Sequence, residues 1–180
     1  MKNTISKIAT AFAALLLVPM VGFAQGQKAS PPDKVSNTIG NATVTISYSQ
    51  PSVKGRTIWG GLVPYGKVWR TGANEATTFE VSSDVKIGDQ TLKSGKYSLF
   101  TIPSEEEWTF IFNEETGQWG TNHNAEKDVI KVKATPEESA QMTEKMTFEI
   151  ADDGMVSLMW ENLKVGFQVS PIESASSTEF

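Results

Sequence analysis

The fold is predicted most directly by residues 145–169, which read KMTFEIADDGMVSLMWENLKVGFQV. Apolar and polar side chains alternate over 145–150 and again over 163–169. This period of two is typical of a strand that buries one face and exposes the other. Asp153-Gly154 and Asn162 interrupt the pattern, and both sites carry residues that favour turns. The stretch therefore predicts antiparallel strands joined by tight turns.

The same alternation continues outward from this stretch. It recurs at 43–48, 77–81 and 107–113, while Gly88-Asp89 separates two short apolar runs as in a hairpin. Residues 96–102 are apolar on both faces, which predicts a central strand. We therefore expect an all-β, antiparallel β-sandwich or jelly-roll-like fold.

One segment predicts a different element. Thr135-Pro136-Glu137-Glu138 has the pattern of a helix start, with Pro at the first position of the helix and acidic residues in its first turn. We therefore expect at most one short helix, which would end near Thr143.

Residues 1–24 have the pattern of a secretory signal peptide. Lys2 and Lys7 precede an uncharged apolar stretch that runs to Ala24, with small residues at 22 and 24. That stretch is short for a membrane-spanning helix, so we expect cleavage near Ala24 and no membrane span in the mature chain. The protein would then work in the periplasm, at the cell surface or outside the cell. We expect a flexible lead-in at 25–34, a single β-sandwich domain at 35–172 and a disordered tail at 173–180.

Composition excludes several kinds of chemistry. The chain has no Cys and one His, so it carries no disulfide, thiol nucleophile or multi-imidazole metal site within one chain. Loss of Lys2 and Lys7 would leave 14 basic residues against 21 acidic ones, a net charge of −7. That balance argues against a nucleic-acid partner. We expect no metal and no cofactor.

Residues 54–76, KGRTIWGGLVPYGKVWRTGANEA, do not alternate. They hold five of the 14 glycines and both arginines of the chain, Arg56 and Arg70. A guanidinium offers a planar fork of donors to a carboxylate or phosphate, so this composition is typical of a ligand-recognition loop. A structural loop, in which Arg caps carbonyls or pairs with Glu75, is the alternative. The candidate ligand-binding residues are Arg56, Tyr65, Trp69, Arg70, Asn74, Glu75 and Trp119.

A nucleotide-binding motif inside this segment is incomplete. Residues 61–67 match G-x-x-x-x-G-K, but Val68 stands where Ser or Thr would hold magnesium. Such a motif must be followed by a helix, and no helical pattern follows residue 68. We therefore expect no nucleotide hydrolysis.

The core WRTGANE at 69–75, preceded by WGGLVPYGKV at 59–68, resembles the signature of an exported bacterial family. That family is known as the domain of unknown function number 2911. The motifs SGKYSLFTIP at 94–103, EWT at 107–109 and QWG at 118–120 also resemble it. The resemblance spans most of the mature chain and implies an exported, mostly β domain. It implies no catalytic residues.

No catalytic residue is assigned from the sequence, and Glu75 and His123 are the candidates. A histidine base needs a nucleophile and an orienting carboxylate, and the sequence around His123 identifies neither. Asp128 is a further carboxylate of interest. For Glu75, the alternative to a catalytic role is an ion pair with Arg70 or Arg56.

Three functions therefore remain open. The first is a binding or structural module for a small anionic or glycan ligand. The second is a hydrolase of cell-envelope glycans or esters that uses Glu75 or His123. The third is a subunit that packs on an envelope protein through residues 54–76.

Export gives the first testable prediction. The mature protein recovered from outside the cytoplasm should begin at Gln25, because the apolar segment before it has the length and end of a cleaved signal. N-terminal sequencing measures this directly, and an exported chain that began at Met1 would refute it.

Overall fold

The computed structural model describes residues 29–172. The expected signal peptide and the expected C-terminal tail therefore lie outside the described residues. Within residues 29–172 there are two antiparallel sheets, one short 3-10 turn and no α-helix. The sequence-based prediction of an all-β sandwich is confirmed.

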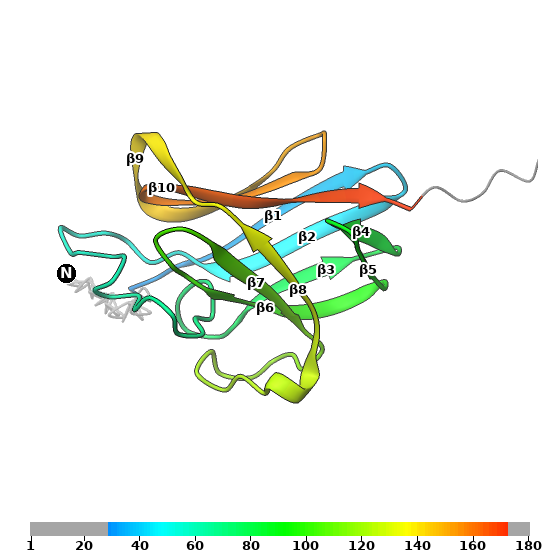
Figure 1. Ribbon diagram of the computed structural model, residues 1–180, viewed down its shortest axis with the longest axis horizontal. Coiled ribbons are helices and arrows are strands. Elements are labelled where there is room, and N and C mark those ends of the chain that lie inside the picture. Colours follow the sequence, from blue (N-terminus) through cyan, green and yellow to red (C-terminus); the bar gives the residue numbers. More distant parts are fainter. Residues whose placement is uncertain (1–28, 173–180) are drawn as a thin grey trace, which may run out of the picture.

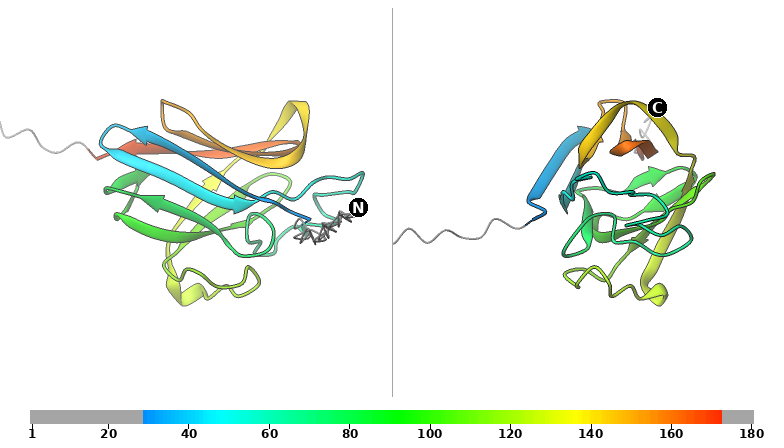
Figure 2. Two further views of the ribbon diagram at one scale, coloured as in Figure 1. Left: turned by 180° about the vertical axis from the view of Figure 1, so that it is seen from behind. Right: turned by 90° about the vertical axis from the view of Figure 1, so that its left-hand side faces the viewer.

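The two sheets lie face to face (Figures 1 and 2). The strands of the larger sheet are β1 (Pro32–Ile39), β2 (Ala42–Ser49), β3 (Thr77–Val81), β6 (Gly95–Ile102), β7 (Trp108–Asn113) and β8 (Asp128–Ala134). Those of the smaller sheet are β4 (Val85–Ile87), β5 (Gln90–Leu92), β9 (Glu137–Ile150) and β10 (Met155–Pro171). Their orders are β1-β2-β3-β6-β7-β8 and β5-β4-β10-β9. The 3-10 turn, Ala125–Lys127, directly precedes β8.

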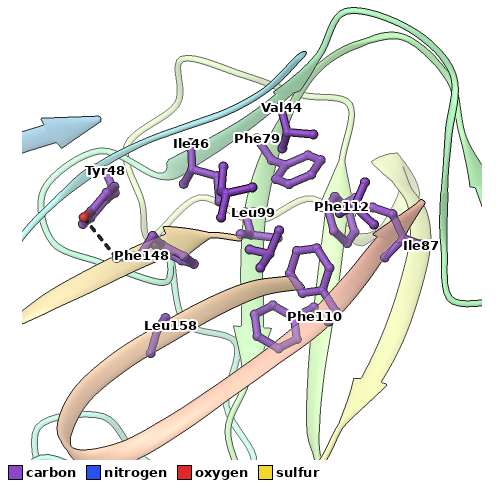
Figure 3. Packing of buried hydrophobic residues seen from close by; sticks show 14 of the residues in the cluster. Val44, Ile46, Tyr48, Phe79, Ile87, Leu99, Phe110, Phe112, Phe148 and Leu158 are labelled. Carbon is purple, nitrogen blue, oxygen red and sulfur yellow. Dashed lines mark hydrogen bonds between the residues drawn. The ribbon is translucent and has the colours of Figure 1, made fainter. Parts of the chain in front are cut away.

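β10 turns back on itself at Glu161, which has a positive φ of 56°. Its pairing with β9 changes register on both sides of Glu161. The amide of Val169 donates to the carbonyl oxygen of Gly154 at 2.9 Å, so the two legs of β10 run side by side (Figure 3). Gly166 packs directly against the backbone of Val156, where a larger residue would have no room. The turn predicted at Asn162 is therefore present.

The prediction of a short helix that starts at Pro136 is wrong, because residues 137–150 form strand β9. Pro136 lies in the turn from β8 into β9, and the two glutamates after it are the first residues of β9. β9 is an edge strand of its sheet, where charged side chains are favoured because they discourage further pairing. Pairing with β10 therefore overrides the local helical preference.

β1 begins at Pro32, within the segment that the sequence assigned to the flexible lead-in. Pro32 pairs with Ser49 at the end of β2, so residues 32–34 are part of the sheet.

The inward faces of both sheets share one hydrophobic core (Figure 3). Val44, Ile46 and Phe79 point into it from the larger sheet, and Phe148 and Leu158 meet them from the smaller one. β6 lies between β3 and β7 and is buried on both faces, as predicted for 96–102. Its outward face supplies Phe100, which forms a second small cluster with Ala76 and Ile111 on β7.

The buried Tyr48 hydroxyl connects the two sheets. It accepts a hydrogen bond from the backbone N–H of Phe148 at 3.0 Å (Figure 3). It also donates one to Asp33 Oδ2 at 2.9 Å. The ring of Tyr48 also packs edge-on against Phe148. Burial, with a further contribution from Asp33, raises the pKa of Tyr48 to about 12. The neutral phenol is therefore the form that the fold requires.

We expect Tyr48→Phe to lower the free energy of unfolding by about 1–3 kcal/mol, because the buried Phe148 N–H loses its acceptor. Urea denaturation followed by tryptophan fluorescence at pH 7 measures the change. Asp33→Asn is the matched control, since it keeps an oxygen for the Tyr48 hydroxyl and leaves the Phe148 bond intact. Equal stability of Tyr48→Phe and the wild type would show that this bond contributes nothing.

Candidate functional site

Residues 54–76 cross one end of the sandwich, the left-hand end in Figure 1. They form no regular strand and touch the sheets through isolated bridges. The strongest of these joins Trp69 to Thr101 on β6. The Trp69 amide donates to the Thr101 carbonyl at 2.7 Å, and the Thr101 amide donates back at 2.8 Å. The segment is therefore attached to a central strand.

Four tryptophans pack together at this end of the sandwich, and two of them, Trp59 and Trp69, belong to residues 54–76. Trp108 on β7 and Trp160 on β10 are fully buried. Trp69 stacks on Trp160 with ring centroids 6.0 Å apart, and Trp59 stands edge-on to Trp108 at 5.0 Å and to Trp160 at 5.6 Å. Trp59 and Trp69 are thus mainly packing residues that close the end of the sandwich.

The turn after Trp69 is held by buried polar contacts. Thr71 is completely buried with a positive φ of 54°, and its hydroxyl lies 3.2 Å from the Thr101 hydroxyl. Thr77 Oγ1 donates to the Thr71 carbonyl at 2.8 Å, and Trp69 Nε1 donates to the Gly72 carbonyl at 3.1 Å. These contacts give the Trp69–Gly72 motif a structural role, and they fix the direction of Arg70 between them.

A cleft of about 300 Å³ opens between this turn and the tryptophans. Its lining combines cationic, aromatic and aliphatic side chains with backbone. The lining residues are Ser30, Pro51, Arg56, Leu62, Val63, Trp69, Arg70, Gly72, Ala73 and Trp160. No acidic residue is among these described lining residues. The cleft therefore brings both arginines of the chain to one surface, with no carboxylate of the described lining to neutralise them.

The two arginines are held differently. Arg56 donates from Nε to the Val53 carbonyl at 3.1 Å and from Nη2 to the Ser52 carbonyl at 2.5 Å. Arg70 Nε is buried and has no hydrogen-bond partner within residues 29–172. The aliphatic part of Arg70 lies against Gly120, where any side chain would collide with it. Arg70 is therefore positioned by packing, and its buried Nε makes no hydrogen bond to a described residue.

The other predicted ligand-binding residues lie outside the cleft lining. Tyr65 borders a separate hollow with Glu105 and Glu106, and burial together with nearby Glu105 and Glu161 raises its pKa. Asn74, at a φ of 61°, donates from Nδ2 to the Ser30 carbonyl at 3.2 Å.

Glu75 and Trp119 form a backbone bridge to each other. Glu75 is exposed, and the Trp119 side chain is 53% exposed. Of the seven candidates, the cleft thus gathers Arg56, Trp69 and Arg70.

His123 lies elsewhere, on the loop between β7 and β8, and it has the orienting carboxylate that the sequence did not identify. His123 Nε2 is 2.8 Å from Asp128 Oδ1, and the imidazole packs edge-on against Phe100 at 4.8 Å. Asn113 Nδ2 donates to the same carboxylate oxygen at 2.8 Å, and Lys131 Nζ is 3.1 Å from Oδ2. The cleft lining includes neither His123 nor Asp128.

The electrostatics of Asp128 follow from these contacts. Burial alone would raise the pKa of its carboxyl group, but the bonds from Asn113, His123 and Lys131 outweigh that effect and hold the pKa below its ordinary value. The carboxylate therefore stabilises the folded state, and it holds the start of β8 to the loop that carries Trp119 and Gly120.

Sequence reasoning did not find Trp160, Gly120 or the role of Asp128. Trp160 is fully buried, and it also lines the cleft because β10 turns directly after it. No signal in the sequence places Gly120 beneath Arg70, since the two residues meet only through the tertiary fold.

We expect Asp128→Asn to lower the free energy of unfolding by about 1–3 kcal/mol at pH 7, because hydrogen bonds to a carboxylate are stronger than those to an amide. A group whose folded pKa is depressed stabilises fully above its unfolded value of about 3.9 and loses that contribution as pH falls through the folded pKa. The difference between variant and wild type should therefore narrow as the pH falls below the unfolded value and through the lower folded pKa. Thermal unfolding by circular dichroism from pH 2.5 to 7 tests this, and a difference that did not vary with pH would contradict it.

Comparisons with known proteins identify a family. The model of a family described as "Protein of unknown function (DUF2911)" matches residues 30–169. A search of curated proteins and a search of solved structures each found no match. Within residues 29–172, no helix is long and apolar enough to span a membrane, and no group of His, Cys, Asp and Glu could hold a metal ion.

Proposed function

The chain belongs to the DUF2911 family of proteins of unknown function, and we propose that it is a binding module that works outside the cytoplasm and takes a small organic anion in the arginine-lined cleft. The binding reaction needs no cofactor. The proposal concerns one site, formed by Arg70, Arg56 and the tryptophan face beside them.

The observation that carries the proposal is the state of Arg70. Its Nε is buried without a hydrogen-bond partner in the described chain, while its side chain lines an open cleft. A buried donor of a charged group is costly unless it is paired, and a carboxylate matches the planar fork of a guanidinium. Arg56 adds a second positive charge to the same cleft. A carboxylate in the cleft would offset both positive charges.

The surroundings of the cleft also support binding. Ligand sites are concave and mostly apolar with a few placed polar groups, and volumes of about 300–1,000 Å³ are usual. The cleft, at about 300 Å³, lies at the small end of this range. The hydrogen bonds from Arg56 to two backbone carbonyls, and the packing of Arg70 on Gly120, hold the guanidinium groups in place before any ligand arrives.

Location outside the cytoplasm rests on the sequence of residues 1–24, with its basic start, apolar stretch and small residues before Gln25. In either the periplasm or the extracellular space, the absence of Cys leaves the fold independent of the redox state.

Hydrolysis is the second candidate function. Because His123 is paired with Asp128, a hydrolase that uses His123 is favoured over one that uses Glu75. A base of this kind is oriented by its carboxylate, as in acyl-transfer enzymes. If it acts, His123→Gln should abolish hydrolysis of an ester such as p-nitrophenyl acetate, while Arg70→Gln should not.

A partner-binding role remains the third candidate. Leu62 is 46% exposed and Val68 is 42% exposed on the same segment. These two side chains would be the contact made with an envelope protein.

We expect Arg70→Gln to weaken binding of hexanoate at least tenfold, because a charge-assisted pair contributes about 1.5–3 kcal/mol. Isothermal titration calorimetry measures it, with hexanamide as the uncharged analogue that should bind poorly to every variant. Lys67→Gln removes the same charge from an exposed residue of the same segment and should leave affinity unchanged.

Gly120→Ala tests the positioning of Arg70 without removing its charge. The new methyl group would collide with the Arg70 side chain and should also weaken hexanoate binding. If wild-type protein does not bind hexanoate, or if Lys67→Gln weakens binding as much as Arg70→Gln, the proposed cleft is wrong.

A further inference from the structure

We infer that the ligand of this cleft is a short hydrocarbon carboxylate, an acid whose body carries neither an ammonium group nor a hydroxyl group. Its carboxylate would lie beside the guanidinium groups of Arg56 and Arg70, and its hydrocarbon part would cover Leu62. This inference rests on the proposed function, because it names the ligand class of the same site.

The positive part of the cleft is open to a ligand. Arg56 is exposed and Arg70 is half-buried. Arg56 uses Nε and Nη2 for the carbonyls of Val53 and Ser52, and a guanidinium has five N–H donors, so Arg56 keeps donors for a ligand. Both arginines line the cleft, and no acidic residue is among the described lining. The cleft therefore attracts an anion and repels a cationic group.

The lining has few hydrogen-bond acceptors to offer a ligand. Ser30 supplies the one side-chain oxygen of the described lining. Several of the backbone carbonyls already accept a hydrogen bond from the protein, and these are the carbonyls of Ser30, Pro51, Val63, Trp69, Arg70 and Gly72. A ligand donor that is buried here would therefore find few replacements for its hydrogen bonds to water, which costs free energy.

This inventory separates the candidate classes of anion. A free amino acid carries an ammonium group beside its carboxylate, and the two guanidinium groups would repel that group. A hydroxy acid or a sugar acid carries hydroxyl donors, which need acceptors when they are buried. A hydrocarbon acid in its ionised form has acceptors only. The lining therefore favours a hydrocarbon acid over an amino acid, a hydroxy acid or a sugar acid.

The apolar part of the lining is also within reach of a ligand. Leu62 lines the cleft and is 46% exposed. Its turn is held in place, because the amides of Leu62 and Val63 donate to the carbonyls of Thr57 and Ile58 at 3.1 and 2.9 Å. The half-buried Trp69 lines the same cleft. A hydrocarbon chain over these side chains removes apolar surface from water, which increases affinity about fourfold for each buried methylene.

Titrations followed by protein NMR at pH 7, which measure weak as well as tight binding, compare hexanoate with related acids. Norleucine has the same six-carbon chain with an added ammonium group, and 2-hydroxyhexanoate has it with an added hydroxyl group. We expect norleucine to bind at least about tenfold more weakly than hexanoate, and 2-hydroxyhexanoate at least about fivefold more weakly. Acetate keeps the carboxylate but lacks the chain, so it should also bind at least about tenfold more weakly.

Two matched variants test the contact with the hydrocarbon chain. Leu62→Ser removes apolar surface from the cleft, and Val68→Ser removes a similarly exposed apolar side chain that belongs to the same segment but does not line the cleft. Leu62→Ser should weaken hexanoate binding about 3–10-fold and leave acetate binding unchanged, because acetate has no chain to cover Leu62. Val68→Ser should change neither affinity. Thermal unfolding of both variants confirms that they remain folded at the titration temperature.

The outcomes separate this inference from the proposed function. If hexanoate binds but norleucine or 2-hydroxyhexanoate binds as tightly, the cleft takes organic anions but not this class. The same conclusion follows if acetate binds as tightly as hexanoate, or if Leu62→Ser and Val68→Ser behave alike. If no carboxylate binds the wild-type protein, both proposals fail.

Discussion

The structure depends on the packing of four tryptophans at one end of the sandwich. Trp108 comes from the larger sheet and Trp160 from the smaller one, while Trp59 and Trp69 come from the segment that crosses between them. Aromatic pairs of this kind stabilise by about 0.5–1.5 kcal/mol each beyond the surface that they bury. One cluster therefore holds the two sheets together and also fixes a segment that has no regular secondary structure.

The cleft is a consequence of that cluster. Successive residues of an extended chain point to opposite sides, so the backbone pairing of Trp69 with Thr101 sends Trp69 inward and leaves Arg70 near the surface. Thr71 then returns to the interior, where its hydroxyl meets that of Thr101. The most conspicuous motif of the sequence thus places packing residues on both sides of the arginine that lines the cleft. Trp69 and Thr71 pack toward the interior, and Arg70 between them lines the cleft.

The loop between β7 and β8 contacts two separate groups of residues. At one end, His123 and Asn113 bind Asp128 and hold the loop against the start of β8. Farther along the same loop, Gly120 supports the Arg70 side chain. The lining of the cleft includes Arg70 but not His123. The Asp128 contacts stabilise a loop on which the geometry of the cleft depends.

The sequence by itself determined the all-β fold, the central strand at 96–102 and the turns at Gly88-Asp89, Asp153-Gly154 and Asn162, because alternation and turn residues are local properties of the chain. It also singled out 54–76 as the segment that breaks the pattern. Only the tertiary structure decided that residues 137–150 form an edge strand and not a helix, because pairing with β10 outweighs local preference. The same holds for the cleft. Arg56, Arg70 and Trp160 are brought together by the sandwich, and contacts between residues so far apart in sequence leave no trace in its local pattern.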